Sequence, residues 1–438
     1  MTLATPITVI RGRFLDIQKT VAQANQIADQ VRYLEDGVLI TEQGKIRWFG
    51  TWNDAQDHLP INIEIQHYPE QLIIPGMIDT HIHFPQTEMV GAYGEQLLSW
   101  LNTYTFPTEI QFKDKAYASE IAKFFVNELL KNGTTTALVF CTVHPESVDA
   151  LFEAAEQHQM RLIAGKVMMD RHAPEALCDS ADSSYDDSKA LIEKWHGQGR
   201  ALYAITPRFA PTSTPEQLER AGQLKAEHPD VYVHTHLSEN KDEIAWVKDL
   251  FPAQKGYLDV YHHYGLTGQR SVFAHCVHLE DAEWQCMHET DSAIAFCPTS
   301  NLFLGSGLFP LNKTWQQQVK VGLGTDVGAG TSFSLLQTVN EAYKVQQLQG
   351  DKLSAYESLY HATLGGAKAL DLDDKLGNFN VGKEADFVVL NLKPTALQQL
   401  RQSRAKSLED SLFALFTMGD DRNVEATYIY GQKAYSQS

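Results

Sequence analysis

The sequence predicts an α/β fold in which a parallel (β/α)8 barrel is joined to a small β-sandwich built from both termini. Three observations favour this architecture. In the middle of the chain, short apolar runs alternate with helix-length segments, and this alternation is typical of a parallel barrel. Short β-type runs separated by turns precede that region. The pattern becomes β-type again near the C-terminus.

These patterns divide the chain into three stretches. Residues 1–74 are expected to form the N-terminal part of the β-sandwich, residues 75–379 the barrel, and residues 380–438 the C-terminal part of the sandwich. In the two end stretches, the expected strands lie at residues 7–10, 37–40, 45–49, 385–390 and 426–431, with a hairpin turn at residues 42–45.

The barrel strands are short apolar runs, and the first of them leads into His81. The other seven are expected at residues 134–140, 162–169, 201–205, 231–235, 271–274, 293–296 and 319–323. In barrel enzymes the working residues come from the C-terminal ends of the strands. Polar side chains at those ends are therefore the candidates for a functional site.

Composition limits the classes of function that the chain can have. Of its 438 residues, 36 are basic and 55 acidic, and the net charge of −19 opposes binding to nucleic acid or to an anionic membrane surface. The five cysteines are scattered, and none forms a Cys-x-x-Cys pair. Neither a signal-peptide pattern nor a membrane-length apolar run is present. We therefore expect a cytoplasmic protein that binds neither nucleic acid nor membrane.

Two histidines at positions i and i+2, His81 and His83, end the first barrel strand. On a strand this spacing puts both imidazoles on one face, and neutral imidazole is the commonest side-chain metal ligand. Taken alone, the pair is as well explained by two unrelated polar residues that leave a strand. The residues downstream decide between these interpretations.

Other predicted strands also end in polar residues. His236 ends the fifth strand, His275 the sixth and Asp326 the eighth. One such residue is often only a hydrogen-bonded polar group, but four histidines and an aspartate in these positions are hard to assemble by chance. Three histidines and one carboxylate suit a single divalent ion such as zinc, one per chain, with water in the remaining position.

A glutamate three residues after His236, Glu239, could act on the water of such a site. A bound divalent ion lowers the pKa of its water to about 7, and a nearby carboxylate can take a proton and return it to a ring nitrogen or leaving group. The alternative is a solvent-facing glutamate at a helix start. His234 repeats the His-x-His spacing, and we interpret it as a supporting or structural histidine.

Six short motifs are spread along the chain, at residues 75–86, 100–109, 206–209, 236–240, 297–302 and 419–423. Together they resemble the amidohydrolase superfamily, and within it the group that deaminates guanine. The resemblance covers nearly the whole chain, and residues 100–109, residues 206–209 and Gln86 are its more specific parts. It implies a TIM-type barrel that assembles as a homodimer and acts in purine catabolism or salvage.

The resemblance also implies roles for individual residues. One zinc ion per chain would be held by His81, His83, His236 and Asp326. The attacking water and the protons would be handled by Glu239, His275 and Asp326. The substrate, guanine, would be bound by Gln86, Arg208, Phe209, His236 and His275. Independently of the resemblance, an arginine fork or a glutamine amide can meet the O6 and N7 acceptors of guanine.

The implied reaction is the hydrolytic deamination of guanine to xanthine and ammonia. Hydroxide attacks C2, Glu239 protonates ring N3, and the tetrahedral intermediate expels ammonia. His275 and Asp326 would stabilise the developing charge and move the proton.

Several alternatives stay open at this point. A related deaminase or chlorohydrolase would act on another amino-purine, a pterin or a triazine. A binuclear relative would need a carboxylated lysine, for which Lys166 is the candidate, although its mid-strand position favours a single metal. The cytidine-deaminase type of zinc site would require a Pro-Cys-x-x-Cys that this sequence lacks. A non-enzymatic scaffold would usually have lost metal ligands, and here none is missing.

Overall fold

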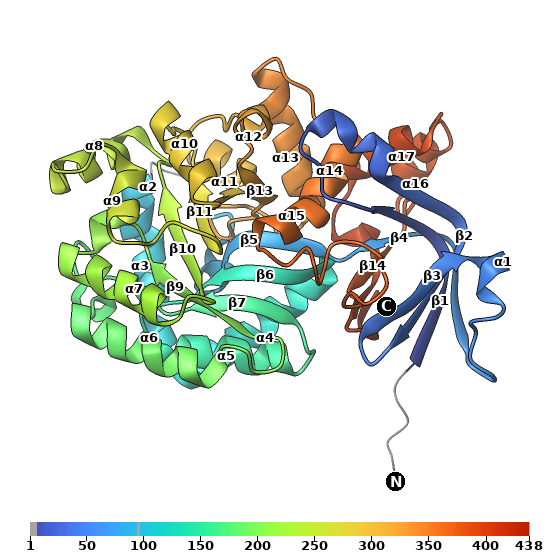
Figure 1. The fold of residues 1–438 in the computed structure, drawn as a ribbon, viewed down its shortest axis with the longest axis horizontal. Coiled ribbons are helices and arrows are strands. Elements are labelled where there is room, and N and C mark those ends of the chain that lie inside the picture. The colour runs from blue at the N-terminus through green and yellow to red at the C-terminus, as the bar shows by residue number, and fades with distance from the viewer. Residues whose placement is uncertain (1–6, 94–96, 438) are drawn as a thin grey trace, which may run out of the picture.

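The computed structural model describes residues 7–93 and 97–437. Two sheets form its framework (Figure 1). The larger sheet curls into a barrel surrounded by helices, and the smaller lies beside it and contains the first and last described strands. The predicted fold class is therefore confirmed, whereas the boundaries at residues 74 and 380 stay a prediction.

The barrel has eight parallel strand positions, and the third is split in two. The strands are β5 (Met77–His83), β6 (Thr134–Phe140), β7 (Arg161–Gly165) with β8 (Val167–Met168), β9 (Leu202–Pro207), β10 (Tyr232–Leu237), β11 (Ser271–His275), β12 (Ala293–Phe296) and β13 (Lys320–Leu323). The last strand meets the first through hydrogen bonds from Asp326 N to the His81 carbonyl (2.9 Å) and from Thr80 Oγ1 to the Leu323 carbonyl (3.0 Å).

The split differs from the continuous strand predicted at residues 162–169. β7 pairs with β6 and β9, whereas β8 pairs only with β9. Between them the backbone N–H of Lys166 donates to the Tyr203 hydroxyl (3.1 Å), and the buried ammonium of Lys166 contacts Asp179. A Cβ on Gly165 would lie 1.6 Å from the Ala204 carbonyl oxygen. Only glycine fits this close approach of two backbones.

Amphipathic helices cover the outside of the barrel. In α4, the buried residues Ala118, Ala122 and Phe125 recur every three or four positions and so form one apolar face. The helices of this part are α4 (Lys115–Lys131), α5 (Pro145–Glu156), α6 (Ala181–Trp195), α7 (Pro215–Glu227), α8 (Lys241–Leu250), α9 (Tyr257–His263), α10 (Asp281–Glu289), α11 (Pro298–Phe303), α12 (Leu311–Gln317), α13 (Leu335–Leu348), α14 (Ala355–Ala362) and α15 (Leu364–Ala369). None of the helices in the described ranges has the length and apolar character needed to cross a membrane.

Short helical turns lie between β5 and α4, and we call the described residues of this stretch, 84–93 and 97–113, the cap segment. Its described turns are η3 (Phe84–Met89), α2 (Leu97–Trp100), the π-helical turn η4 (Leu101–Thr105), α3 (Phe106–Glu109) and η5 (Ile110–Lys113). Because this segment directly follows His83, it lies over the C-terminal end of the first strand.

The second sheet has seven strands in the order β16-β15-β14-β4-β1-β2-β3. They are β1 (Ile7–Ile17), β2 (Val31–Glu42), β3 (Lys45–Thr51), β4 (Ile65–Pro75), β14 (Phe387–Leu390), β15 (Val424–Ile429) and β16 (Gln432–Ser436). β1 and β4 are parallel, and the other pairs are antiparallel. The predicted hairpin turn joins β2 to β3 through Gln43 and Gly44, whose φ angles of 52° and 77° suit a tight two-residue turn.

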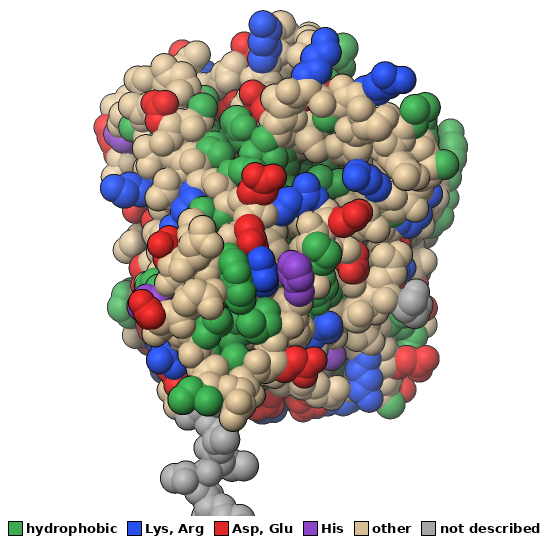
Figure 2. Space-filling model, turned by 90° about the vertical axis from the view of Figure 1, so that its right-hand side faces the viewer, with side chains coloured by type: hydrophobic (Ala, Val, Ile, Leu, Met, Phe, Trp, Pro, Cys, Tyr) green, Lys and Arg blue, Asp and Glu red, His purple; other side chains and the backbone are tan. Residues whose placement is uncertain are grey.

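The remaining short elements flank the two sheets. They are α1 (Trp52–Ala55), α16 (Ala396–Gln402), α17 (Leu408–Met418), η1 (Ala24–Gln26), η2 (Ala28–Gln30), η6 (Glu175–Leu177), η7 (Ala210–Thr212) and η8 (Asp421–Asn423). On the face in Figure 2, basic and acidic side chains are interspersed. Among the described residues drawn there, no continuous basic surface of the kind that phosphate backbones require is seen.

A buried ion network joins the barrel to the second sheet. Arg161 and Arg200 precede or begin barrel strands, whereas Glu384 and Asp386 lead into β14. Arg200 Nε donates to Glu384 Oε2 (3.1 Å), Arg200 Nη1 to Asp386 Oδ1 (3.1 Å), and Arg161 Nε to Glu384 Oε2 (3.1 Å). Burial opposes ionisation of Glu384, but the two guanidiniums outweigh it and lower the pKa of this carboxyl.

We predict that Arg200→Met lowers the free energy of unfolding by about 3–5 kcal/mol, because it removes the arginine partner of the buried Asp386 and leaves Glu384 with Arg161 alone. Urea denaturation followed by circular dichroism measures this change. Arg220→Met is the control, because the ion pair that it breaks, with Asp182, is exposed, and it should unfold near the wild-type midpoint. Equal midpoints for the two variants would contradict the proposed importance of the buried network.

Candidate active site

A pocket opens at the C-terminal ends of the barrel strands, which is where barrel enzymes place their active sites. Its lining residues are His83, Gln86, Trp100, Leu101, Arg208, Phe209, His236, Glu239, Glu243, His275, Leu304, Asp326 and Ala329. Every site residue named from the sequence is among them except His81, which is fully buried behind the pocket wall.

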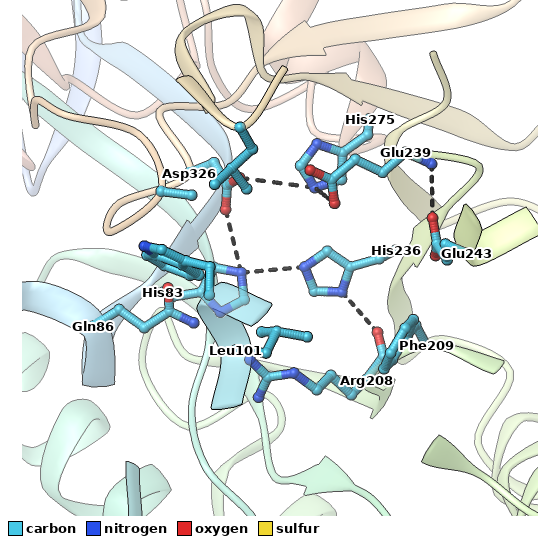
Figure 3. Close-up of a pocket in the computed structure, with 13 residues that line it drawn as sticks. His83, Gln86, Leu101, Arg208, Phe209, His236, Glu239, Glu243, His275 and Asp326 are labelled. Carbon is cyan, nitrogen blue, oxygen red and sulfur yellow. Dashed lines mark hydrogen bonds and ion pairs between the residues drawn. The ribbon is translucent and has the colours of Figure 1, made fainter. Parts of the chain in front are cut away.

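Four candidate donor atoms converge at the base of this pocket. His83 Nε2 lies 3.2 Å from His81 Nε2 and 3.2 Å from His236 Nε2. Asp326 Oδ1 lies 3.1 Å from His81 Nε2 and 3.3 Å from His83 Nε2. Figure 3 shows His83, His236 and Asp326 turned toward one another. We call His81, His83, His236 and Asp326 the donor cluster.

The spacing of the donor cluster fits a bound divalent cation. Ring nitrogens that face one another at 3.2 Å cannot all be satisfied by hydrogen bonds among themselves. Around a zinc ion with bonds of about 2.0–2.1 Å, donor atoms that subtend about 90–110° at the ion are separated by about 2.9–3.4 Å. Four of the separations in the cluster, 3.1–3.3 Å, lie in this range. These four residues could therefore hold a metal ion.

Two contacts turn ring nitrogens of the cluster toward its centre. His236 Nδ1 lies 2.7 Å from the Arg208 carbonyl oxygen, so this nitrogen carries the proton and leaves Nε2 with a lone pair. His81 Nδ1 lies 2.7 Å from His234 Nε2. His234 therefore contacts the ring nitrogen of His81 that faces away from the other donor atoms. A metal-binding histidine commonly makes a hydrogen bond through its second ring nitrogen in this way.

Burial keeps the histidine rings of the cluster neutral. It lowers the pKa of His83 to about 3, and it also lowers the pKa of His81 and His236. The Phe140 ring packs against the rings of His83 and His236, with centroids 4.6 Å apart in both pairs. The cluster is thus made of neutral rings, two of which pack against an apolar neighbour. Neutral imidazole is the form that binds metals.

At two of the strand ends, the backbone adopts a conformation that is rare for residues other than glycine. His275 has φ 72° and Asp326 has φ 51°, in the left-handed region that costs about 1–2 kcal/mol for a residue with a Cβ. Asp79 stabilises the turn that precedes Asp326, because its carboxylate accepts hydrogen bonds from Thr325 N (3.1 Å) and Thr325 Oγ1 (2.5 Å). Backbone strain at such positions is common in functional sites.

Glu239 lies beside the cluster and is only 2% exposed, so it is not the solvent-facing residue of the alternative interpretation. Its Oε1 accepts a hydrogen bond from Ser306 Oγ (3.0 Å), and its Oε2 lies 3.5 Å from His275 Nε2. Burial and the nearby Asp326 carboxylate raise the pKa of Glu239 to about 8. A carboxyl with such a pKa can both accept and donate a proton near neutral pH.

His275 lies between Glu239 and Asp326. Its Nε2 is 3.7 Å from Asp326 Oδ2, and its Nδ1 is 2.8 Å from Asn301 Oδ1. The amide oxygen of Asn301 therefore accepts the Nδ1 proton, and Nε2 is left to face the pocket.

Gln86 and Arg208 lie across the cluster from Glu239 and His275 (Figure 3). Both are buried and line the pocket, and Phe209 lies next to Arg208. Gln86 Oε1 accepts a hydrogen bond from Gly328 N (3.2 Å). One side of the pocket therefore offers amide and guanidinium groups, and the other offers groups that can exchange protons.

Several residues of the site were missed by reasoning from sequence. Phe140 is the last residue of a predicted strand, and Asn301 and Glu109 lie within motifs that the resemblance had singled out. Ser306 and Glu243 carried no signal. Lys166, the candidate for a bridging ligand, does not line the pocket, and its ammonium is paired with Asp179. The geometry thus gives no support to a binuclear site.

Comparisons with known proteins agree with this geometry. Residues 72–434 match the amidohydrolase family. The chain is 62% identical over 432 residues to the guanine deaminase of Escherichia coli (strain K12), covering 99% of this chain and 98% of that protein. The solved structure of E. coli guanine deaminase matches with a TM-score of 0.96 at 60% identity, over 99% of this chain and 100% of that one.

A second solved structure is that of guanine deaminase from C. acetobutylicum with bound guanine in the active site. It matches with a TM-score of 0.88 at 30% identity, over 98% of this chain and 100% of that one. A likeness of this extent, shared by sequence and structure over nearly the whole length, shows the family. The chain belongs to the amidohydrolase family and, within it, to the guanine deaminases, which are hydrolases acting on C–N bonds.

Proposed function

We propose that this chain catalyses the hydrolytic deamination of guanine to xanthine and ammonia with one zinc ion per chain. The observation that carries the proposal is the arrangement of the pocket, in which Gln86 and Arg208 face Glu239 and His275 across the donor cluster. The relatives named guanine deaminase, one of them solved with guanine bound, support the choice of substrate.

The donor cluster would hold the metal. His81, His83 and His236 supply neutral ring nitrogens and Asp326 a carboxylate oxygen, a set that suits zinc. When bound, the ion supplies hydroxide at neutral pH, because it lowers the pKa of a coordinated water to about 7.

Gln86 and Arg208 bind and orient the purine. Guanine presents hydrogen-bond acceptors at O6 and N7, and the N–H groups of an amide and a guanidinium are donors that match them. Phe209 supplies an apolar surface beside Arg208. With the O6 and N7 edge held on this side, C2 of guanine is directed toward the cluster, with His236 and His275 beside the reacting end.

Glu239 moves the proton that the reaction must transfer. As a carboxylate it accepts a proton from the attacking water, and as a carboxylic acid it donates that proton to ring N3. His275 and Asp326 stabilise the charge that develops at C2 and pass a proton to the amino group, so that it leaves as ammonia. Water is consumed, the C2–N bond breaks, and the C2–O bond of xanthine forms.

Assembly as a homodimer and location in the cytoplasm belong to the same proposal, and they rest on the family resemblance. Light scattering coupled to size-exclusion chromatography would give the mass of the assembly, which a homodimer sets at twice the 49.2 kDa of the chain.

We predict that Glu239→Gln lowers kcat for guanine at least about 10²-fold, because the amide can neither accept nor donate the transferred proton. Ultraviolet absorbance of the guanine to xanthine conversion measures the rate. Glu341→Gln, at a partly exposed glutamate that is paired with Lys344 and lies outside the pocket, should turn over at the wild-type rate. A zinc-loaded wild type that leaves guanine unchanged would redirect the assay to other amino-purines, pterins and triazines.

Removal of one donor should abolish metal binding. We predict that His83→Ala loses most of the roughly one zinc ion per chain expected for the wild type, because it removes the ring nitrogen that lies within 3.3 Å of the other three donor atoms of the cluster. Elemental analysis after dialysis gives the zinc content. His67→Ala, at an exposed histidine of the second sheet, should retain it. Wild-type zinc content in His83→Ala would contradict the assignment of the cluster.

A further inference from the structure

Glu109 lies directly behind the two residues that face the purine in the proposed site. It ends α3 of the cap segment, is fully buried, and does not line the pocket. Its Oε2 accepts a hydrogen bond from Arg208 Nη1 (2.7 Å), and its Oε1 accepts one from Gln86 Nε2 (3.2 Å). One carboxylate therefore holds both side chains, with one oxygen for each.

These contacts set the orientation of the Gln86 amide. Gln86 Nε2 donates a hydrogen bond to Glu109, while Gln86 Oε1 accepts one from Gly328 N (3.2 Å). An amide that is flipped by 180° would lose both bonds, because an oxygen would then face the carboxylate and an NH2 group would face the backbone N–H. One N–H of Gln86 is left over to face the pocket.

Glu109 also balances the charge of Arg208. The guanidinium is only 3% exposed, and a buried charge is costly unless a partner compensates it. Among the described residues, Glu109 is its ion-pair partner. The carbonyl oxygen of the same arginine accepts the His236 Nδ1 hydrogen bond (2.7 Å). A shift of Arg208 would therefore disturb the purine-facing side and the donor cluster together.

We propose that Glu109 is a positioning residue that aims the free N–H groups of Gln86 and Arg208 at the acceptor edge of guanine and thereby sets selectivity for that edge. The inference rests on the proposed function. It extends that function to Glu109, which contacts neither the proposed substrate nor the donor cluster. Glu109 would act through Gln86 and Arg208, the two side chains that are proposed to bind guanine.

The test compares zinc-loaded wild type with Glu109→Gln on guanine and on two analogues. 7-Deazaguanine lacks the N7 acceptor, and 2,6-diaminopurine carries an amino group in place of O6. The variant should lose about 10²-fold in kcat/KM for guanine, mainly through a higher KM, because misplaced binding groups cost about this much. The preference of the wild type for guanine over the analogues should shrink in the variant.

Two further variants separate positioning from folding. Glu109→Asp keeps the negative charge beside Arg208 but moves the carboxylate away from it, because the aspartate side chain is shorter. This variant should fold even if Glu109→Gln does not. It should show a smaller loss of the preference for guanine over the analogues. Glu283→Gln is the matched control, because Glu283 is a buried glutamate that accepts hydrogen bonds from Leu258 N and Glu280 N outside the pocket. It should lower stability and leave KM and the preference unchanged.

The outcomes distinguish this inference from the proposed function. Wild type active on guanine, with analogue preferences unchanged in the Glu109 variants, would overturn the inference and leave the function standing, whatever happens to KM. A wild type that does not turn over guanine would overturn both. A reduced preference in the Glu109 variants, with Glu283→Gln unaffected, supports both.

Discussion

The structure depends on four lone-pair donors, each of which lies 3.1–3.3 Å from at least one of the others in a buried site. Neutral imidazoles and a carboxylate repel one another at such distances unless a cation lies between them. The eight strands bring these donors together because their C-terminal ends meet at one rim, and the first strand alone supplies His81 and His83. A barrel that failed to close between β13 and β5 would separate Asp326 from these histidines. The site can therefore form only when the barrel closes.

The donors keep their places because backbone and side-chain groups outside the cluster hold each of them. The Arg208 carbonyl orients His236, His234 orients His81, and Asp79 supports the turn before Asp326. Each of these contacts joins residues that lie on, or within two residues of, different barrel strands, so the site is supported by the barrel itself and not by one loop. The strained φ angle of Asp326 is stable only because such contacts outweigh its cost.

Much of this arrangement could be predicted from the sequence, because strand alternation, turn residues and polar strand ends are local signals. The hairpin at residues 42–45 and the His81 and His236 positions are of this kind. The split at Lys166 could not be predicted, since it depends on how closely Gly165 approaches the backbone of Ala204. The contact of Glu109 with Arg208 also could not be predicted, because the two residues are 99 positions apart. A local sequence pattern does not indicate which distant side chains meet across the mouth of the barrel.

The charges of the site are divided between two sides of the pocket, and this division explains its chemistry. On the side proposed to face the purine, Glu109 and Arg208 form a buried pair without net charge, which would suit a neutral base bound by hydrogen bonds. On the side proposed to react, Glu239 and Asp326 have no arginine or lysine partner among the described residues, and their mutual repulsion helps to raise the pKa of Glu239. A cation in the donor cluster would relieve that repulsion and favour the carboxylate form of Glu239. The same ion that activates water would therefore also prepare the residue that takes its proton.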